Sequence, residues 1–299
     1  MVADEQVTIT RGSEGIYRAP FIDNFHNVEI NADIITWKIS EPKIDIKMIL
    51  KDEPAGFSSY NYFKEYRYER LQGMLNYNPL QKIKQYCDQE RIKEFKLESY
   101  AKFAGSKTEN LIPQFIQLHD DGFIKFDPDK RYVKVYDKTF NYVNSHYGRT
   151  DYDVINFQSV IGGLPNASVN LENFDMKVEG VPQIKFSDSQ TVFAVPKDQR
   201  FVLKKNREMQ LAGKVRAGRF EFFGNGFGFN YQKFTVDMNN VDSMRFFFPD
   251  ENNRLVKVNS VLENISGTLF IDQQYNKSGL KDYPEYPIFK SNKGSKVYY

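Results

Sequence analysis

The sequence predicts an α+β fold that is mainly β, with a helical insert between two β-rich flanks. In residues 1–56, apolar and polar side chains alternate with a period of two and include many β-branched residues, as in half-buried strands. Residues 57–148 change to helical spacing, and residues 149–299 return to short strands separated by Gly, Asn and Asp. These turn residues recur at irregular intervals, so we expect either a solenoid-like stack of strands or a β-sandwich in the flanks.

Composition excludes several classes of protein. The chain has 299 residues, of which 41 are basic and 39 acidic, so its net charge is only +2. This balance removes the bulk attraction that favours nucleic acid. The 26 Phe and 19 Tyr provide enough apolar surface for a folded core, which argues against intrinsic disorder. No apolar run reaches the roughly 18 residues of a membrane-spanning helix, so we expect no transmembrane segment.

Helical spacing is clearest in residues 79–138. Asn78 followed by Pro79 is a typical helix start, and Leu80, Ile83 and Cys87 then lie on one helical face, where a lone cysteine is expected to be buried. A short extended link at Ile92–Phe95 leads to a second helix that ends at Gly105. Ser106 and Glu109 match a capping box that would begin a third helix, and residues 123–135 have the pattern of a β-hairpin.

This order of helix, link, helix, turn, helix and hairpin resembles a winged helix-turn-helix domain. The segment Leu118–Ile124 is similar to the usual join between third helix and wing. The resemblance implies that the third helix would enter the major groove of DNA. Between Ser106 and Gly122, however, one basic residue faces three acidic ones, and Pro113 interrupts the helix. We therefore expect no nucleic-acid binding; under the alternative, the phosphate contacts would be Lys125, Lys130, Arg131 and Lys134 of the wing.

The segment Gly213–Tyr231 alternates glycine with aromatic residues. No Lys-Ser or Lys-Thr follows its glycines, so the pattern indicates closely packed strands and not a phosphate loop. The aromatic side chains either belong to the core or line a groove for a lipid or a glycan. The residues of this possible groove are Phe220, Phe222, Phe227, Phe229 and Tyr231.

The C-terminal half resembles the β repeats of AsmA-like and lipopolysaccharide-transport proteins through Met209–Gly213 and Asn264–Ile271. More broadly, the chain is similar to segments of very large uncharacterised envelope proteins of Bacteroidota-type bacteria. That resemblance implies a location in the periplasm or cell envelope, as part of a larger exported chain, and implies no chemistry. A cytoplasmic location is the alternative, because residues 1–10 lack the features of an export signal.

No catalytic motif is present in the sequence, and the three histidines are too sparse for a histidine-rich metal site. Of the neighbouring acidic residues, only Asp151 and Asp153, at a segment boundary, are kept as a candidate pair. We therefore predict a non-enzymatic scaffold or protein-binding segment with no cofactor and no metal, whose partners are neighbouring domains of a longer chain. The alternatives are a winged-helix nucleic-acid-binding protein and a glycan- or lipid-binding β domain.

Overall fold

The computed structural model describes residues 5–12, 18–50, 52–73, 75–250, 254–292 and 297–298. Strands predominate over helices, which confirms the mainly β, α+β class. In the described part of the chain, no helix is both long and apolar enough to cross a bilayer. The chain divides into a helical unit, Thr10–Phe21 and Tyr60–Tyr152, and a β unit, Met1–Ile9, Ile22–Ser59 and Asp153–Tyr299.

The two β-rich flanks belong to one unit, which corrects the prediction of three consecutive segments (1–56, 57–148 and 149–299). Strand β5 (Lys43–Lys47) pairs with β11 (Ala167–Asn170), and β6 (Ala55–Ser59) pairs with β10 (Asn156–Ser159). Between β11 and β5, Ser168 Oγ donates to Asp45 Oδ1 at 2.6 Å, across 123 residues of sequence. Hydrophobic periodicity is local, so it does not reveal such distant pairings.

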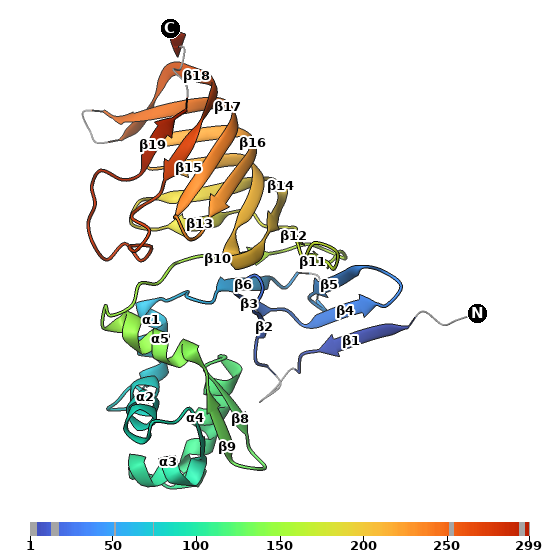
Figure 1. The fold of residues 1–299 in the computed structure, drawn as a ribbon, viewed down its shortest axis with the longest axis vertical. Coiled ribbons are helices and arrows are strands. Elements are labelled where there is room, and N and C mark those ends of the chain that lie inside the picture. The colour runs from blue at the N-terminus through green and yellow to red at the C-terminus, as the bar shows by residue number, and fades with distance from the viewer. Residues whose placement is uncertain are drawn as a thin grey trace. The chain divides into compact units, whose positions relative to one another are not determined.

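A 13-stranded sheet forms the body of the β unit (Figure 1). Its main path has the order β1-β4-β5-β11-β12-β14-β15-β16-β17-β18-β19, with β13 on β14 and β20 on β18. Every pairing from β4 to β19 along this open path is antiparallel. The remaining bounds are β1 Gln6–Thr10, β4 Ile34–Lys38, β12 Met176–Val178, β13 Ile184–Ser187, β14 Val192–Leu203, β15 Met209–Ala217, β16 Phe220–Asn230, β17 Thr235–Pro249, β18 Leu255–Phe270, β19 Ile288–Ser291 and β20 Val297–Tyr298.

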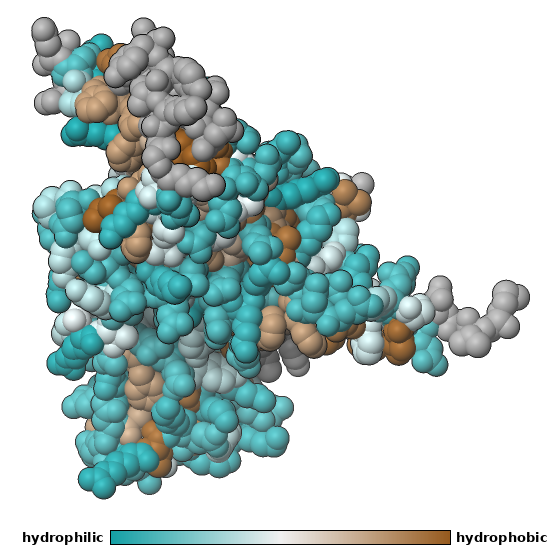
Figure 2. Space-filling view, turned by 45° about the horizontal axis from the view of Figure 1, so that its top comes forward, coloured by the Kyte–Doolittle hydropathy of each residue, from teal (hydrophilic) through white to brown (hydrophobic). Residues whose placement is uncertain are grey.

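The two faces of the large sheet differ in polarity, because side chains alternate between the faces along each strand. One face carries two adjacent in-register rows of buried apolar side chains, which form the core of the β unit. These rows are Val178, Phe201, Leu211, Phe227, Met238 and Met176, Leu203, Met209, Phe229, Val236. On the molecular face shown in Figure 2, hydrophilic side chains predominate and apolar ones form small groups.

A four-stranded sheet of order β10-β6-β3-β2 completes the β unit, with β2 at Phe21–Asp23 and β3 at Val28–Asn31. The rings of Phe57 on β6 and Phe157 on β10 stack with their centroids 5.1 Å apart. Phe157 also meets the edge of Phe201, on β14, with a centroid distance of 5.1 Å. The small sheet therefore packs through aromatic contacts against the core of the large one.

The helical unit has the predicted order of elements between residues 79 and 138. Its three-stranded sheet has the order β7-β9-β8, and its core includes the fully buried Leu80, Ile83, Tyr100 and Phe115. Cys87 is buried, as predicted. The bounds are α1 Glu65–Gln72, α2 Pro79–Glu90, β7 Glu94–Lys96, α3 Leu97–Ala104, α4 Thr108–Asp120, β8 Ile124–Asp127, β9 Tyr132–Val135 and α5 Asp137–His146.

The predicted start of α2 is confirmed, and the predicted capping box of α4 is not formed. The side chain of Asn78 accepts hydrogen bonds from the backbone N–H of Leu80 at 2.9 Å and of Gln81 at 3.5 Å, so it caps α2. The prediction of a capping box at the start of α4 is wrong. Lys107 occupies the N-cap position, and no side chain caps the helix there. Helix α4 begins one residue later than the box requires, so the Ser106 hydroxyl is not placed to accept from its first turn.

Candidate functional site

The strongest candidate for a functional surface is the polar face of the large sheet, opposite the core. One register row on this face contains, in strand order from β5 to β18, Asp45, Ser168, Lys177, Val202, Gln210, Gly228, Asp237 and Thr268. Neighbouring strands lie about 4.8 Å apart, so this row forms a polar band across the strands and not along one of them.

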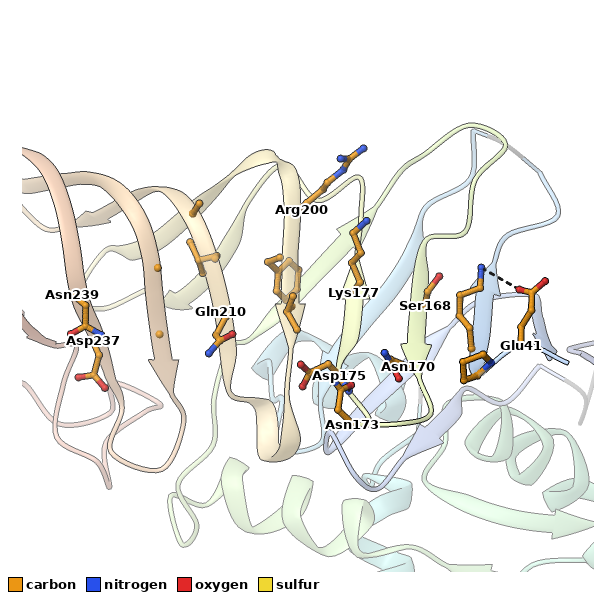
Figure 3. A pocket seen from close by; sticks show the side chains of 18 residues that line it. Glu41, Ser168, Asn170, Asn173, Asp175, Lys177, Arg200, Gln210, Asp237 and Asn239 are labelled. Carbon is orange, nitrogen blue, oxygen red and sulfur yellow. Dashed lines mark hydrogen bonds and ion pairs between the residues drawn. The ribbon is translucent and has the colours of Figure 1, made fainter. Parts of the chain in front are cut away.

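A hollow of about 1150 Å³ lies on this face, between the loop before β5 and strand β17. Figure 3 shows that its side chains come from many strands: Asn170, Asn173 and Asp175 gather at one end of β11 and β12, and Lys177 and Arg200 extend toward the other. The polar residues that line it are Glu41, Lys43, Ser168, Asn170, Asn173, Asp175, Lys177, Arg200, Gln210, Asp237 and Asn239.

Glycine forms the floor of the hollow on β16. Along this strand Phe227 and Phe229 point into the core, so the alternating Gly226 and Gly228 face the hollow. Gly228 lies in register between Gln210 on β15 and Asp237 on β17. These two side chains are therefore separated by two strand spacings, roughly 10 Å, with no side chain between them.

Charges in the hollow are balanced, and several are paired. Its lining has three acidic residues, Glu41, Asp175 and Asp237, and three basic ones, Lys43, Lys177 and Arg200. Lys204 Nζ lies 2.8 Å from Asp175 Oδ2, Lys177 Nζ lies 2.6 Å from Glu179 Oε1, and Lys43 Nζ lies 3.2 Å from Asp45 Oδ2. The hollow thus presents neither a basic nor an acidic field to a ligand.

Amide groups in the hollow are available for a ligand. The side chains of Gln210 and Asn239 make no hydrogen bond to any residue that the structure describes. Asn170 uses its Oδ1 to accept from the backbone N–H of Glu172 at 2.7 Å, and Asp237 uses its Oδ1 to accept from Thr268 Oγ1 at 3.1 Å. Each keeps its second polar atom for another partner, so the hollow offers both donors and acceptors.

The aromatic groove, which was one of the two interpretations of Gly213–Tyr231, is not formed. Phe222, Phe227 and Phe229 are 0%, 0% and 2% exposed, because their face of β16 carries in-register apolar partners. Tyr231, one residue beyond the strand, is also buried. Phe220 is the exception. It is partly exposed and lines a separate hollow of about 560 Å³, together with Phe246, Phe248, Tyr286, Pro284 and Pro287.

For these phenylalanines the structure agrees with the first of the two interpretations of the sequence, in which the aromatic side chains belong to the core. The phenylalanines at 227 and 229 mark the core, and the glycines at 226 and 228 mark the accessible face. Gln210 and Asp237 were not identified from the sequence. In a strand whose side chains alternate between polar and apolar, a single polar residue looks like any other solvent-facing position. Only the register of β15, β16 and β17 brings them to the two sides of one glycine.

Asp153, half of the candidate acidic pair, is fully buried in a hydrogen-bonded cluster of the β unit. Its Oδ2 accepts from Ser59 Oγ at 2.6 Å and from the Tyr231 hydroxyl at 2.8 Å, and lies 3.8 Å from Arg207 Nη1. Burial raises the pKa of the Asp153 carboxyl, and the hydrogen bonds from Ser59 and Tyr231 partly oppose that shift. These contacts link the end of β6 to the segment before β10, which indicates a structural role.

The four basic residues of the predicted wing lie on exposed or half-exposed positions of the helical unit. Three of them face carboxylates: Lys134 Nζ lies 2.8 Å from Glu94 Oε1, Lys130 Nζ lies 3.2 Å from Asp127 Oδ2, and Arg131 Nη1 lies 3.3 Å from Glu98 Oε1. Lys125 is opposite Lys134 in the hairpin and has no carboxylate partner among the described residues. The cations of the hairpin are thus largely neutralised by the unit itself.

No protein-family model, curated protein or solved structure matches this chain. Within the ranges that the structure describes, no three His, Cys, Asp or Glu side chains are grouped so that they could hold a metal ion.

Proposed function

We propose that this chain is a non-enzymatic scaffold and binding segment of a larger, envelope-associated bacterial protein. The observation that carries the proposal is the polar hollow, whose lining spans strands from β5 to β17 and has unpaired amides above a continuous core. A sheet held together by a packed core keeps such side chains at constant spacing, as recognition requires. The envelope location rests on the resemblance to AsmA-like and lipopolysaccharide-transport repeats.

The test is ligand-induced thermal stabilisation of the purified chain against a panel of oligosaccharides, peptides and lipid headgroup analogues. We expect one chemical class to raise the melting temperature saturably, since a ligand that binds only the folded state stabilises it. The double variant Gln210→Ala/Asp237→Ala should abolish the effect. Gln158→Ala, at an exposed position of β10, is the matched control and should preserve it. If no class stabilises the wild-type chain, the proposal fails.

The alternative, a winged-helix nucleic-acid-binding protein, is favoured by the order α2-β7-α3-α4-β8-β9 and by the unpaired Lys125. Its test is fluorescence anisotropy with duplex and single-stranded DNA between about 50 and about 200 mM salt, where phosphate contacts weaken steeply. We expect no binding. Salt-dependent binding that Lys125→Ala reduces, and that Lys177→Ala leaves unchanged, would instead support the alternative.

A further inference from the structure

We propose that the ligand of the hollow is an uncharged, hydroxyl-rich saccharide chain. This inference rests on the proposed function, because it concerns the same surface and names the chemistry that the surface recognises. It follows from four properties of the hollow: its hydrogen-bonding groups, its charge balance, the state of its backbone and its glycine floor.

Hydrogen-bonding groups in the hollow match those of a sugar. A carboxamide offers two N–H donors and a carbonyl acceptor in one plane, and a carboxylate offers two acceptors. Each sugar hydroxyl both donates and accepts, so neighbouring hydroxyls are complementary to the free side chains of Gln210 and Asn239 and to the free oxygen of Asp237. A hydrocarbon chain would leave these groups desolvated and unpaired, which disfavours its binding.

Charge balance selects against ionic ligands. Three acidic and three basic residues line the hollow, and Lys177 and Asp175 already have partners at 2.6 and 2.8 Å. A polyanion would require an excess of cations, as in phosphate- or sulfate-binding sites. A neutral polymer meets no such requirement, because it interacts with each charged group through hydrogen bonds alone.

The backbone under the hollow argues against an extended peptide. Peptides that bind sheets usually add a strand at an exposed edge, where unpaired N–H and C=O groups supply most of the contacts. Strands β15 and β16 are interior strands, each paired on both sides. Ala212 and Gly226 lie at a shift of register, but Gln210 and Gly228 are paired on both sides, so recognition at these two positions must come from side chains.

Glycine at positions 226 and 228 allows a ring to lie against the floor. Between Gln210 and Asp237 nothing rises above the backbone of β16, so a sugar could contact the strand directly while the two flanking side chains bind its hydroxyls. The volume of about 1150 Å³ exceeds the roughly 300–1,000 Å³ of typical ligand pockets. The hollow therefore suits a chain of several sugar units better than a monosaccharide.

The experiment is isothermal titration calorimetry with maltohexaose, cellohexaose and chitohexaose as neutral probes. A heparin hexasaccharide and a capped, uncharged Ser/Asn-rich hexapeptide serve as comparison probes. We expect at least one neutral hexasaccharide to bind saturably, and Gly228→Leu to weaken that binding at least tenfold by filling the floor. A Cβ at Gly228 would meet only Asp237 Cβ, at 3.9 Å, so the substitution is compatible with the fold. Gly162→Leu, in an exposed loop with nothing within 4 Å, is the matched control and should bind normally.

The outcomes separate this inference from the proposed function. If only the peptide or only heparin binds, and Gly228→Leu abolishes that binding, the ligand is not a neutral saccharide. The proposed binding function of the hollow would then still hold. Saccharide binding that Gly228→Leu does not change would overturn the assignment to the hollow. Failure of every probe, together with no stabilisation by the broader panel, would overturn both.

Discussion

The hydroxyl of Tyr231 donates a hydrogen bond of 2.8 Å to the fully buried Oδ2 of Asp153, 78 residues earlier in the chain. Ser59 Oγ donates to the same oxygen at 2.6 Å, and the guanidinium of Arg207 lies 3.6 Å from the centre of the Tyr231 ring. Asp153, a candidate for an acidic pair, and Tyr231, a candidate for an aromatic groove, thus belong to one structural cluster. Its members come from segments far apart in sequence, so loss of one should destabilise the whole β unit.

Tyr231→Phe should lower the free energy of unfolding by about 1–3 kcal/mol, because it removes a donor to a buried carboxyl group. Chemical denaturation monitored by circular dichroism measures the loss. Tyr275→Phe is the control in the same unit: Tyr275 is 57% exposed, and the change should be within about 0.5 kcal/mol. Equal effects of the two substitutions would show that the Asp153 contact contributes nothing to stability.

The stability contributed by Asp153 should decrease as pH rises. Burial raises the pKa of its carboxyl above the ordinary 3.8, so the folded protein binds this proton more tightly than the unfolded chain does. The contribution is therefore complete below about pH 4 and is lost as pH rises through the folded pKa. We expect the free energy of unfolding of wild type, minus that of Asp153→Asn, to fall as pH rises from about pH 4 through the raised pKa of Asp153. A difference that is constant or rises with pH would contradict the raised pKa.

Phe227→Ala should destabilise the β unit by about 3–5 kcal/mol, because it creates a cavity in a close-packed core. Phe248→Ala, at a position that is 57% exposed, should change stability by about 0.5 kcal/mol or less. Thermal and denaturant unfolding of both variants supply the comparison. A small effect at Phe227 would instead place its ring in an accessible groove.

Asn78→Ala should destabilise the helical unit by about 1 kcal/mol, because the side chain satisfies two backbone N–H groups at the start of α2. Ser106→Ala should have almost no effect, since no side chain caps α4. Amide hydrogen exchange in the first turns of α2 and α4 resolves the two helices separately. Faster amide exchange in the first turn of α4 in Ser106→Ala would show that Ser106 does cap this helix, as the sequence predicted.

Local patterns in the sequence determined much of this protein's secondary structure. Alternation around Ile44 and Ile46 predicted strand β5, and Asn78-Pro79 predicted the start of α2. Such features depend on neighbouring residues alone: the period of two or 3.6, and the unpaired N–H groups of a first helical turn. The capping box at Ser106 failed because its motif fits several registers, and the helix begins at only one of them.

Tertiary structure alone decided which strands meet and which face of each strand is covered. The sequence shows that phenylalanine and glycine alternate from Gly226 to Phe229, but not which set faces the core. That choice depends on the apolar rows of β14, β15 and β17, whose register with β16 is non-local. The same register places Gln210 and Asp237 on either side of Gly228. A separate pairing joins β5 to β11 across more than a hundred residues. The hydrophobic periodicity of a strand does not show which distant strand pairs with it. The candidate site was therefore visible only in the tertiary structure.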